Sequence, residues 1–220
     1  MMSLATVQHS PIETIMGAYD CLDTGHRFYH APLDFAQLKH CALIDLYAMP
    51  RVGLRGADAA DYLIGLGFCL PDRPNQLSVQ ADGTVVARLS ATEYFLFGAL
   101  QDRGQRVAAI EQQWQLETDV AHYLLPRQDS HTCIQLTGDC APQLMAKLCG
   151  VDLATEQFKA GDVVQTSVAR INAIIMNVSD NITRFNIFCD RAAALYMWDV
   201  VVDAMQEFNG QIMGIEALTI

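Results

Sequence analysis

A histidine and two potential nucleophiles stand together at residues 130–133, which read SHTC. Adjacent side chains point to opposite faces of a β-strand, so an extended Ser130–His131 pair predicts no serine–histidine contact. Cys133 would share a strand face with His131, which makes a cysteine–histidine nucleophile pair conceivable. The apolar run around Cys133 instead favours a buried, structural thiol.

Two further patterns bear on possible chemistry. His26 and His30 are four residues apart, a spacing that suits a metal ion on a helix, but no third ligand is evident. Glu93 is the main carboxylate of the predicted central strands, and general acid–base catalysis would need such a group. No serine-hydrolase, zinc-protease, phosphate-loop or dinucleotide-binding motif is present. We therefore expect no catalytic, cofactor-binding or metal-binding residue in this chain.

The composition is typical of a folded globular protein. Of 220 residues, 51% are hydrophobic and 18% are charged, which is enough for a sizeable core. A net charge of −11 argues against a nucleic-acid partner and favours solubility, with a basic protein partner as the alternative. Seven cysteines without a C-x-x-C pair predict free thiols in a reducing compartment. With no signal peptide or membrane span in sight, we expect a cytoplasmic protein without membrane contact.

A weak internal repeat organises the chain. The stretches "RVGLRGADAADYL" near residue 51 and "HTCIQLTGDCAPQL" near residue 131 both read strand, glycine, acidic residue and helix. Leu54 matches Leu136, and Gly56 matches Gly138. An aspartate follows each glycine near the helix start, where its carboxylate could meet free N–H groups.

Each copy continues with paired strands and closes on an amphipathic helix. The second closing helix has the clearer pattern, with apolar residues at Ala194, Trp198, Val201, Met205 and Phe208. Trp198 is therefore predicted to be a core anchor. Two packed β-α-β-β-α-like units predict an α+β fold with largely antiparallel sheets.

These elements divide the chain into four predicted parts. We expect an N-terminal arm at 1–40, a first α+β repeat unit at 41–120, a second at 121–210, and a C-terminal tail at 211–220. The joint between the two units is placed in a polar, proline-containing stretch.

The stretch "ADGTVVARLSATEYFLFG" at residues 81–98 predicts a hairpin. Along its first strand, Val85, Ala87 and Leu89 point to one face and Arg88 to the other. Ala87 is then a core residue. Arg88 lies on the more polar face, where local pairing and a partner contact are both open, and it is our candidate interface residue.

Three segments carry a resemblance to a known family. They are "LSATEY" at 89–94, the pattern F-x-x-G-x-x-x-Q-T at 158–166, and "YMWDVVVDAMQEF" at 196–208. In their order and spacing the chain, over roughly residues 43 to 209, resembles the γ subunit of heterotetrameric sarcosine oxidase. That subunit is similar in fold to the folate-binding domains of glycine-cleavage T-protein.

The resemblance also implies the loss of an enzymatic group. In the T-protein the segment matching Gly83 to Leu89 reads roughly G-G-I-I-D-D-L, and an aspartate there is needed for one-carbon transfer to tetrahydrofolate. This chain reads "GTVVARL", with Ala87 and Arg88 in place of the two acids. An arginine stays protonated and cannot accept a proton from a substrate amine. The chain also lacks the length for the T-protein's additional C-terminal domain.

The resemblance implies a non-catalytic, γ-type structural subunit of a flavin-dependent complex that oxidises sarcosine or a related N-methyl amino acid, such as N-methylglutamate. Its α and β partners would hold FAD, FMN, NAD and tetrahydrofolate, one flavin being covalent, and this chain would bind none of them. The alternative is a stand-alone folate-binding or aminomethyltransferase-like protein, which predicts a pterin-sized pocket with an acid. A family member with a different partner is a third possibility.

Overall fold

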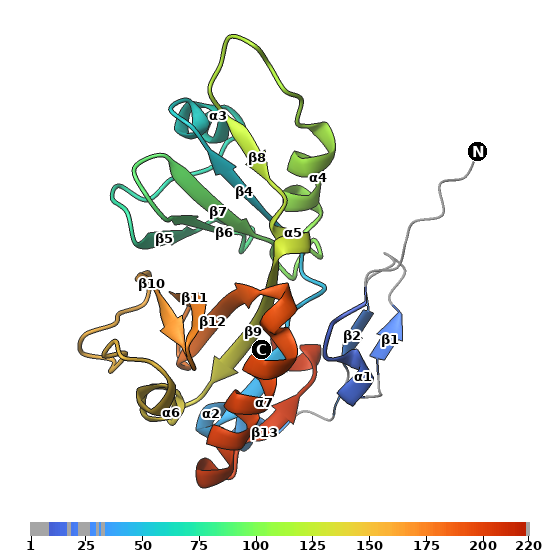
Figure 1. The fold of residues 1–220 in the computed structure, drawn as a ribbon, viewed down its shortest axis with the longest axis vertical. Helices are drawn as coiled ribbons and strands as arrows, with labels where there is room; N and C mark the ends of the chain where they lie inside the picture. The colour runs from blue at the N-terminus through green and yellow to red at the C-terminus, as the bar shows by residue number, and fades with distance from the viewer. Residues whose placement is uncertain (1–8, 17–18, 22–26, 30, 32–33, 219–220) are drawn as a thin grey trace.

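The protein is described from a computed structural model of the 220-residue chain. The described residues are 9–16, 19–21, 27–29, 31 and 34–218. Two β-sheets lie one above the other in the view of Figure 1. We refer to them below as the upper and the lower sheet.

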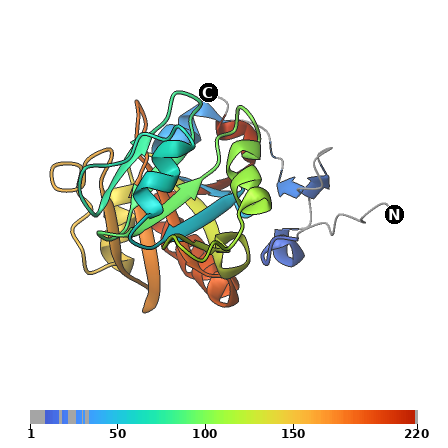
Figure 2. The same ribbon diagram turned by 90° about the horizontal axis from the view of Figure 1, so that it is seen from above.

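The upper sheet has five strands, in the order β5 (Gln76–Val79), β6 (Val85–Arg88), β7 (Glu93–Phe97), β4 (Arg51–Arg55) and β8 (Tyr123–Leu125). All neighbouring strands are antiparallel. Helices α3 (Ala59–Gly65) and α4 (Gln105–Gln113) cover its outer face (Figure 2). Alternating strand residues such as Leu54 and Val86 pack against Leu63 and Val107 of these helices.

The lower sheet has six strands, in the order β10 (Val163–Val168), β11 (Ile171–Asn177), β12 (Arg184–Asp190), β9 (His131–Thr137), β3 (Ala42–Asp45) and β13 (Gln211–Met213). Only β13 runs parallel to its neighbour, β3, among these strands. Helices α6 (Ala141–Leu148) and α7 (Ala194–Met205) pack on its outer face. Trp198 is 2% exposed there, which confirms its predicted role as a core anchor.

A third core lies between the inner faces of the two sheets. The rings of Phe95 and Phe188 meet there with centroids 4.7 Å apart, and Ala87 and Cys133 are buried beside them. The molecule is thus layered as helices, sheet, sheet, helices. The predicted α+β fold, with helices on one face of each sheet, is confirmed.

The internal repeat is visible as a pseudo-twofold arrangement. The segments β4-α3-β5-β6-β7-α4 and β9-α6-β10-β11-β12-α7 follow the same path in their sheets. Each unit has three strands after its first helix, one more than the predicted β-α-β-β-α-like pattern. Sequence reasoning missed β5 because its residues, QLSV, are half polar and none is fully buried.

Each sheet also takes a strand from the chain that precedes the other unit. β3 leads into the first unit but pairs with β9 of the lower sheet. β8 leads into the second unit but pairs with β4 of the upper sheet. The sheets therefore mix the two halves of the sequence. The division of the chain at residues 40, 120 and 210 stays a prediction.

The turn after the first strand departs from expectation. Asp58 stands at the start of α3, but its carboxylate accepts a hydrogen bond from the N–H of Ala121 at 2.7 Å and makes no cap bond to its own helix. The backbone of Ala121 passes so close that a Cβ on Gly56 would lie 1.9 Å from its oxygen. Gly56 has φ +142°, and Gly138, its match, has φ +106°.

The remaining elements are short. They are α1 (Glu13–Met16), β1 (Tyr19–Cys21), β2 (Arg27–Tyr29), α2 (Phe35–His40), α5 (Arg127–Ser130) and the 3₁₀ turns η1 (Arg191–Ala193), η2 (Gln206–Phe208) and η3 (Ile215–Leu218). β1 and β2 pair with each other, and Leu38 of α2 is buried between the sheets. His26 and His30 lie outside the described residues. In the described part of the chain, no helix is long and apolar enough to cross a membrane.

Candidate functional site

The strand β6 separates its two notable side chains as the alternation predicts. Ala87 is fully buried in the core between the sheets, together with Val85 and Leu89. Arg88 is half-buried on the opposite face, which the helices cover. At position 87 the inner face of β6 therefore presents a methyl group and no ionisable side chain.

Arg88 is held by backbone carbonyls close to it in the fold. Its Nη1 donates to the oxygens of Asp72 at 2.8 Å and Pro71 at 3.3 Å. Its Nη2 donates to Ala91 at 3.0 Å, and its Nε donates to Ser90 at 3.3 Å. These bonds fix two loops against the hairpin. The partner-contact role of Arg88 stays a prediction.

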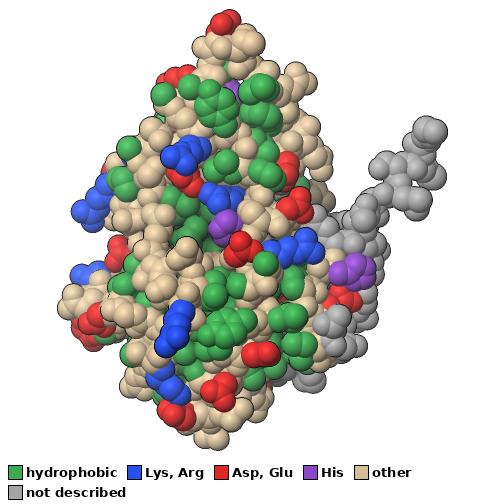
Figure 3. Space-filling view, viewed as in Figure 1, with side chains coloured by type: hydrophobic (Ala, Val, Ile, Leu, Met, Phe, Trp, Pro, Cys, Tyr) green, Lys and Arg blue, Asp and Glu red, His purple; other side chains and the backbone are tan. Residues whose placement is uncertain are grey.

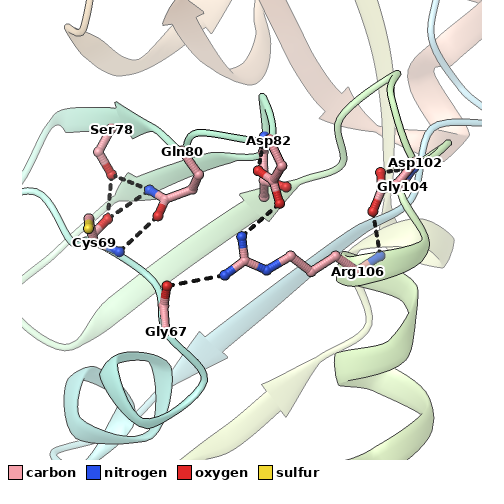
Figure 4. A network of polar contacts seen from close by, with 9 residues as sticks. Gly67, Cys69, Ser78, Gln80, Asp82, Asp102, Gly104 and Arg106 are labelled. Atoms are coloured by element: carbon pink, nitrogen blue, oxygen red, sulfur yellow. Dashed lines mark hydrogen bonds and ion pairs between the residues drawn. The ribbon is translucent and has the colours of Figure 1, made fainter.

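A second arginine fixes the other end of the same hairpin (Figure 4). Arg106 of α4 donates from Nη1 to Asp82 at 2.7 Å and from Nη2 to the Gly67 oxygen at 3.1 Å, with its guanidinium over the Phe68 ring. Burial alone would raise the pKa of Asp82, but hydrogen bonds from Arg106 and Thr84 outweigh it and hold that pKa below its usual range. The turn at Asp82 is thus tied to α4 and to the loop after α3.

The side chain of Gln80 continues this network. It accepts from the N–H of Cys69 at 2.8 Å and donates to the oxygen of Cys69 at 2.9 Å, and Ser78 donates to the same oxygen at 2.6 Å (Figure 4). Gln80 and Ser78 thus bind both the N–H and the carbonyl of Cys69, which ties the loop after α3 to the end of β5. The hairpin at 81–98 is therefore held in place by side-chain hydrogen bonds, and these bonds engage Arg88 and Asp82.

A cavity of about 190 Å³ opens between the sheets at one end of the inner core. Two buried amides face each other there, and Gln135 donates from Nε2 to Oδ1 of Asn186 at 2.7 Å. The Oε1 of Gln135 is buried and has no hydrogen-bond partner among the described residues. The other lining residues are mainly apolar: Leu46, Met49, Val79, Gly83, Val85, Phe97, Gly98, Ala99, Leu100, Val178 and Leu218. The cavity could take a small, largely apolar group with one hydrogen-bond donor.

A second hollow, of about 380 Å³, opens on the face with His131 and is lined also by Gln165, Thr166, Asn172, Ala173, Ile174 and Phe188.

The predicted separation of Ser130 from His131 is wrong, because Oγ of Ser130 lies 2.8 Å from Nδ1 of His131. Ser130 is the last residue of a short helix, not part of a strand, so adjacent side chains can meet.

This serine–histidine contact is not built for nucleophilic catalysis. Burial, assisted by the positive charges of Arg127 and Arg51, lowers the pKa of His131 to about 4. A general base works best with a pKa near the operating pH, so His131 is too weak to activate Ser130. Ser130 also donates to the carbonyl of Pro126 at 3.0 Å.

The thiols near histidines are not activated either. Cys133 is fully buried, and burial raises the pKa of its thiol far above the usual value, which supports the predicted structural role. A pair that sequence reasoning missed joins Cys140 to His40, with 3.6 Å from Sγ to Nδ1, while His40 donates from Nε2 to the Phe208 oxygen. Burial, with the charge of Asp139, raises the pKa of this thiol too. The pair spans 100 residues, and no local pattern could reveal it.

Glu93, the predicted strand carboxylate, is engaged in ion pairs. Arg127 donates to its Oε1 at 2.5 Å, and Arg55 stands 3.9 Å from its Oε2. Both carboxylate oxygens of Glu93 are thus engaged by guanidinium groups of this chain. No three His, Cys, Asp or Glu side chains of the described residues lie close enough to hold a metal ion.

This architecture defines a protein of the T-protein-like class, with two sheets, a pseudo-twofold repeat and an inner cavity. Residues 75–220 match the family described as the GCVT N-terminal domain. The chain belongs to this family. The T-protein-like fold expected from the sequence is thereby confirmed.

Two solved structures share the fold. A chain of the heterotetrameric sarcosine oxidase from Corynebacterium sp. U-96, in complex with pyrrole 2-carboxylate, is similar with a TM-score of 0.66 and 19% identity, covering 92% of this chain and 97% of that one. The glycine cleavage system aminomethyltransferase T from Bartonella henselae is similar with a TM-score of 0.69 and 14% identity, covering 98% of this chain and 61% of that one. No curated protein matches the sequence.

The T-protein likeness raises the question of whether the cavity fits a reduced folate. Its volume of about 190 Å³ is below the roughly 300–1,000 Å³ of typical small-molecule sites. Its described lining includes no carboxylate, although a pterin-binding acid was expected for a folate protein. Elsewhere in the inner core, Ala87 places a buried methyl group where the resemblance implies an aspartate. This cavity, together with the alanine at position 87, does not fit a folate bound for one-carbon transfer.

Proposed function

We propose that this chain is the non-catalytic γ-type structural subunit of a flavin-dependent heterotetrameric sarcosine oxidase. The complex would oxidise sarcosine or a related N-methyl amino acid and pass the one-carbon unit to tetrahydrofolate. In this proposal the α and β partners hold FAD, FMN, NAD and the folate, and the complex works in the cytoplasm. This chain supplies a scaffold surface on which the other subunits assemble.

The observation that carries the proposal is a difference in coverage. Alignment with the sarcosine oxidase chain accounts for 97% of that chain, whereas alignment with the aminomethyltransferase accounts for 61% of its chain. Because the shared fold accounts for nearly the whole of an oxidase chain, we favour a component of such an assembly over a transferase.

The inner face of β6 supports the same conclusion. One-carbon transfer in the T-protein needs an aspartate, and Ala87 supplies no proton acceptor at the matching place. Arg88 uses its donors on four backbone carbonyls and is positioned to brace loops. Neither residue can take a proton from a substrate amine.

Purification from the native source tests the proposal. The chain would carry a removable tag, and the isolated material would be examined by mass spectrometry and by visible absorbance. We expect two or more larger chains in fixed ratio, a flavin spectrum, and peroxide formation with sarcosine or another N-methyl amino acid. Recovery of the chain alone, without flavin, under gentle conditions would contradict the proposal.

A second candidate function rests on the unpartnered Oε1 of Gln135. A buried acceptor inside a cavity is a feature of ligand sites, so the alternative is a lone chain that binds a small folate-related ligand without transferring its one-carbon unit. Titration of the purified chain with a reduced folate separates the two functions, with Gln135→Leu as the matched control.

A further inference from the structure

The two sheets differ at one strand position. In the lower sheet β13 lies beyond β3, whereas in the upper sheet no described strand lies beyond β8. β3 lies beside β9 in the lower sheet, and β8 holds the equivalent place beside β4 in the upper sheet. The registers agree, since Ala42 stands opposite Thr137 and Tyr123 stands opposite Arg55. Thr137 and Arg55 each follow the matched leucine of the repeat. Ala42 and Tyr123 are thus counterparts.

The chain covers the free side of β3 with its own C-terminal segment. β13 adds to β3 as a parallel strand, with Gln211 opposite Ala42 and Met213 opposite Ile44. Met213 and Ala217 then bury their side chains against the inner face of the lower sheet. Ala42 and Ile44 are fully buried as a result.

No described strand pairs with the free side of β8. Tyr123 is 49% exposed, and Leu116, in the loop that leads to β8, is 69% exposed. On the face shown in Figure 3, hydrophobic side chains reach the surface over the upper sheet, close to basic and acidic ones. An edge strand with its backbone groups free and an aromatic side chain beside it is a template for strand addition.

The charges beside this edge define what a partner must bring. Arg55 projects on the same side of the sheet as Tyr123, and its side chain is 66% exposed. Its carboxylate, Glu93, is 3.9 Å away and is bonded more closely by Arg127 at 2.5 Å. Arg55 and Arg127 therefore share the carboxylate of Glu93. A carboxylate on a partner protein would give Arg55 an ion pair of its own.

We propose that β8 is the docking edge for a partner subunit, which adds a strand parallel to β8 as β13 adds to β3. The partner strand places an apolar side chain against Tyr123 and a carboxylate against Arg55. The inference rests on the proposed function, because it takes the partner to be a subunit of the same oxidase complex.

The test uses the native complex and three tagged forms of the full chain. Tyr123→Lys puts a charge at the edge, and Arg55→Glu reverses the cation. Ile64→Lys is the matched control, because Ile64 is 58% exposed on α3 and is not part of the edge strand. We expect at least tenfold less partner subunit with Tyr123→Lys, a smaller loss with Arg55→Glu, and wild-type recovery with Ile64→Lys. Thermal unfolding of each free variant identifies any that fails to fold.

Hydrogen exchange gives an independent measurement on the wild-type chain. The outward amides of Tyr123–Leu125 should exchange rapidly in the free chain and become protected in the complex, while those of Ala42–Asp45 stay protected in both. Intact complexes with Tyr123→Lys and unchanged exchange in β8 would overturn the docking edge and leave the proposed function standing. A wild-type chain without partners would overturn both. Self-association lost in Tyr123→Lys would assign the edge to a second copy and reject the partner.

Discussion

The upper and lower sheets follow one plan but end differently. In the lower sheet β13 and the chain's own C-terminal residues cover β3, and apolar side chains fill the core beneath it. In the upper sheet the equivalent edge ends at Tyr123, with half of that side chain exposed. One repeat unit thus has its added strand covered by the chain itself, whereas its copy leaves the matching strand partly exposed.

The two sheets also differ at a matched inner position. Arg51 and Cys133 each stand three residues before the leucine of the repeat. Cys133 is a small buried thiol, whereas Arg51 is a buried guanidinium that donates to the carbonyls of Tyr47, Met49 and His131. Arg51 thus ties the upper sheet to His131 of the lower sheet by hydrogen bonds, whereas Cys133 at the matched position contributes packing.

The largest expected effect breaks this contrast. Arg51→Met should lower the free energy of unfolding by about 3–5 kcal/mol, because three buried carbonyls lose their donor. Cys133→Ala at the matched position should cost about 1–2 kcal/mol, as a small cavity does. Urea unfolding of both variants measures the difference. Equal losses would show that the Arg51 bonds add nothing beyond packing.

Returning the acid to β6 is the next test. Ala87→Asp should cost about 3 kcal/mol at pH 7, since a carboxylate would enter a closed apolar core. Burial raises the pKa of such an acid, so the cost should shrink as pH falls toward 4 and the group becomes protonated. Urea unfolding at the two pH values checks the sign. A variant as stable as the wild type at pH 7 would mean that the core admits a carboxylate.

The histidine at the junction gives a smaller, pH-dependent effect. The pKa of His131 is about 4 in the fold against about 6.5 when unfolded, so the unfolded chain binds the extra proton between these values. Stability is therefore full above pH 6.5 and falls as pH drops toward 4, by about 1–2 kcal/mol after allowance for partial exposure. His131→Gln should flatten this part of the curve in urea unfolding at pH 5 and pH 7. An unchanged slope would assign the pH effect to other groups.

The smallest contrast concerns thiol chemistry. Cys69 in the upper unit is exposed, while Cys133, Cys140 and Cys189 in the lower unit are buried, and burial, with the charge of Asp190, raises the pKa of Cys189 to about 12. In a Cys21→Ser background, a thiol reagent at pH 8 should modify Cys69 at least about 100-fold faster than these three. Peptide mapping follows the sites. A fast phase that survives Cys69→Ser would show that the lower core opens readily.

Much of the fold could be predicted from local patterns. Gly56 and Gly138 mark sharp turns that an L-residue would adopt only with strain, and the apolar spacing around Trp198 marks a helix with one buried face. The alternation along β6 correctly separated Ala87 from Arg88. These features depend on residues close together in sequence, so one sequence is enough to find them.

The features that were missed depend on distant pairing. The exchange of β3 and β8 between the sheets joins residues about 70 positions apart in one case and about 90 in the other, and short strands carry too little pattern to indicate their partners. The Ser130–His131 contact was misjudged because four residues of helix precede the strand. The amide pair of Gln135 and Asn186 becomes a cavity wall only when β9 and β12 align.

The most direct test of the claim that this chain shapes an assembly, and does not carry out turnover, is calorimetric titration of the purified chain with a reduced folate. The account predicts no binding up to about 1 mM, which corresponds to less than roughly 4 kcal/mol of affinity. A micromolar, single-site dissociation constant that Gln135→Leu abolishes would contradict it.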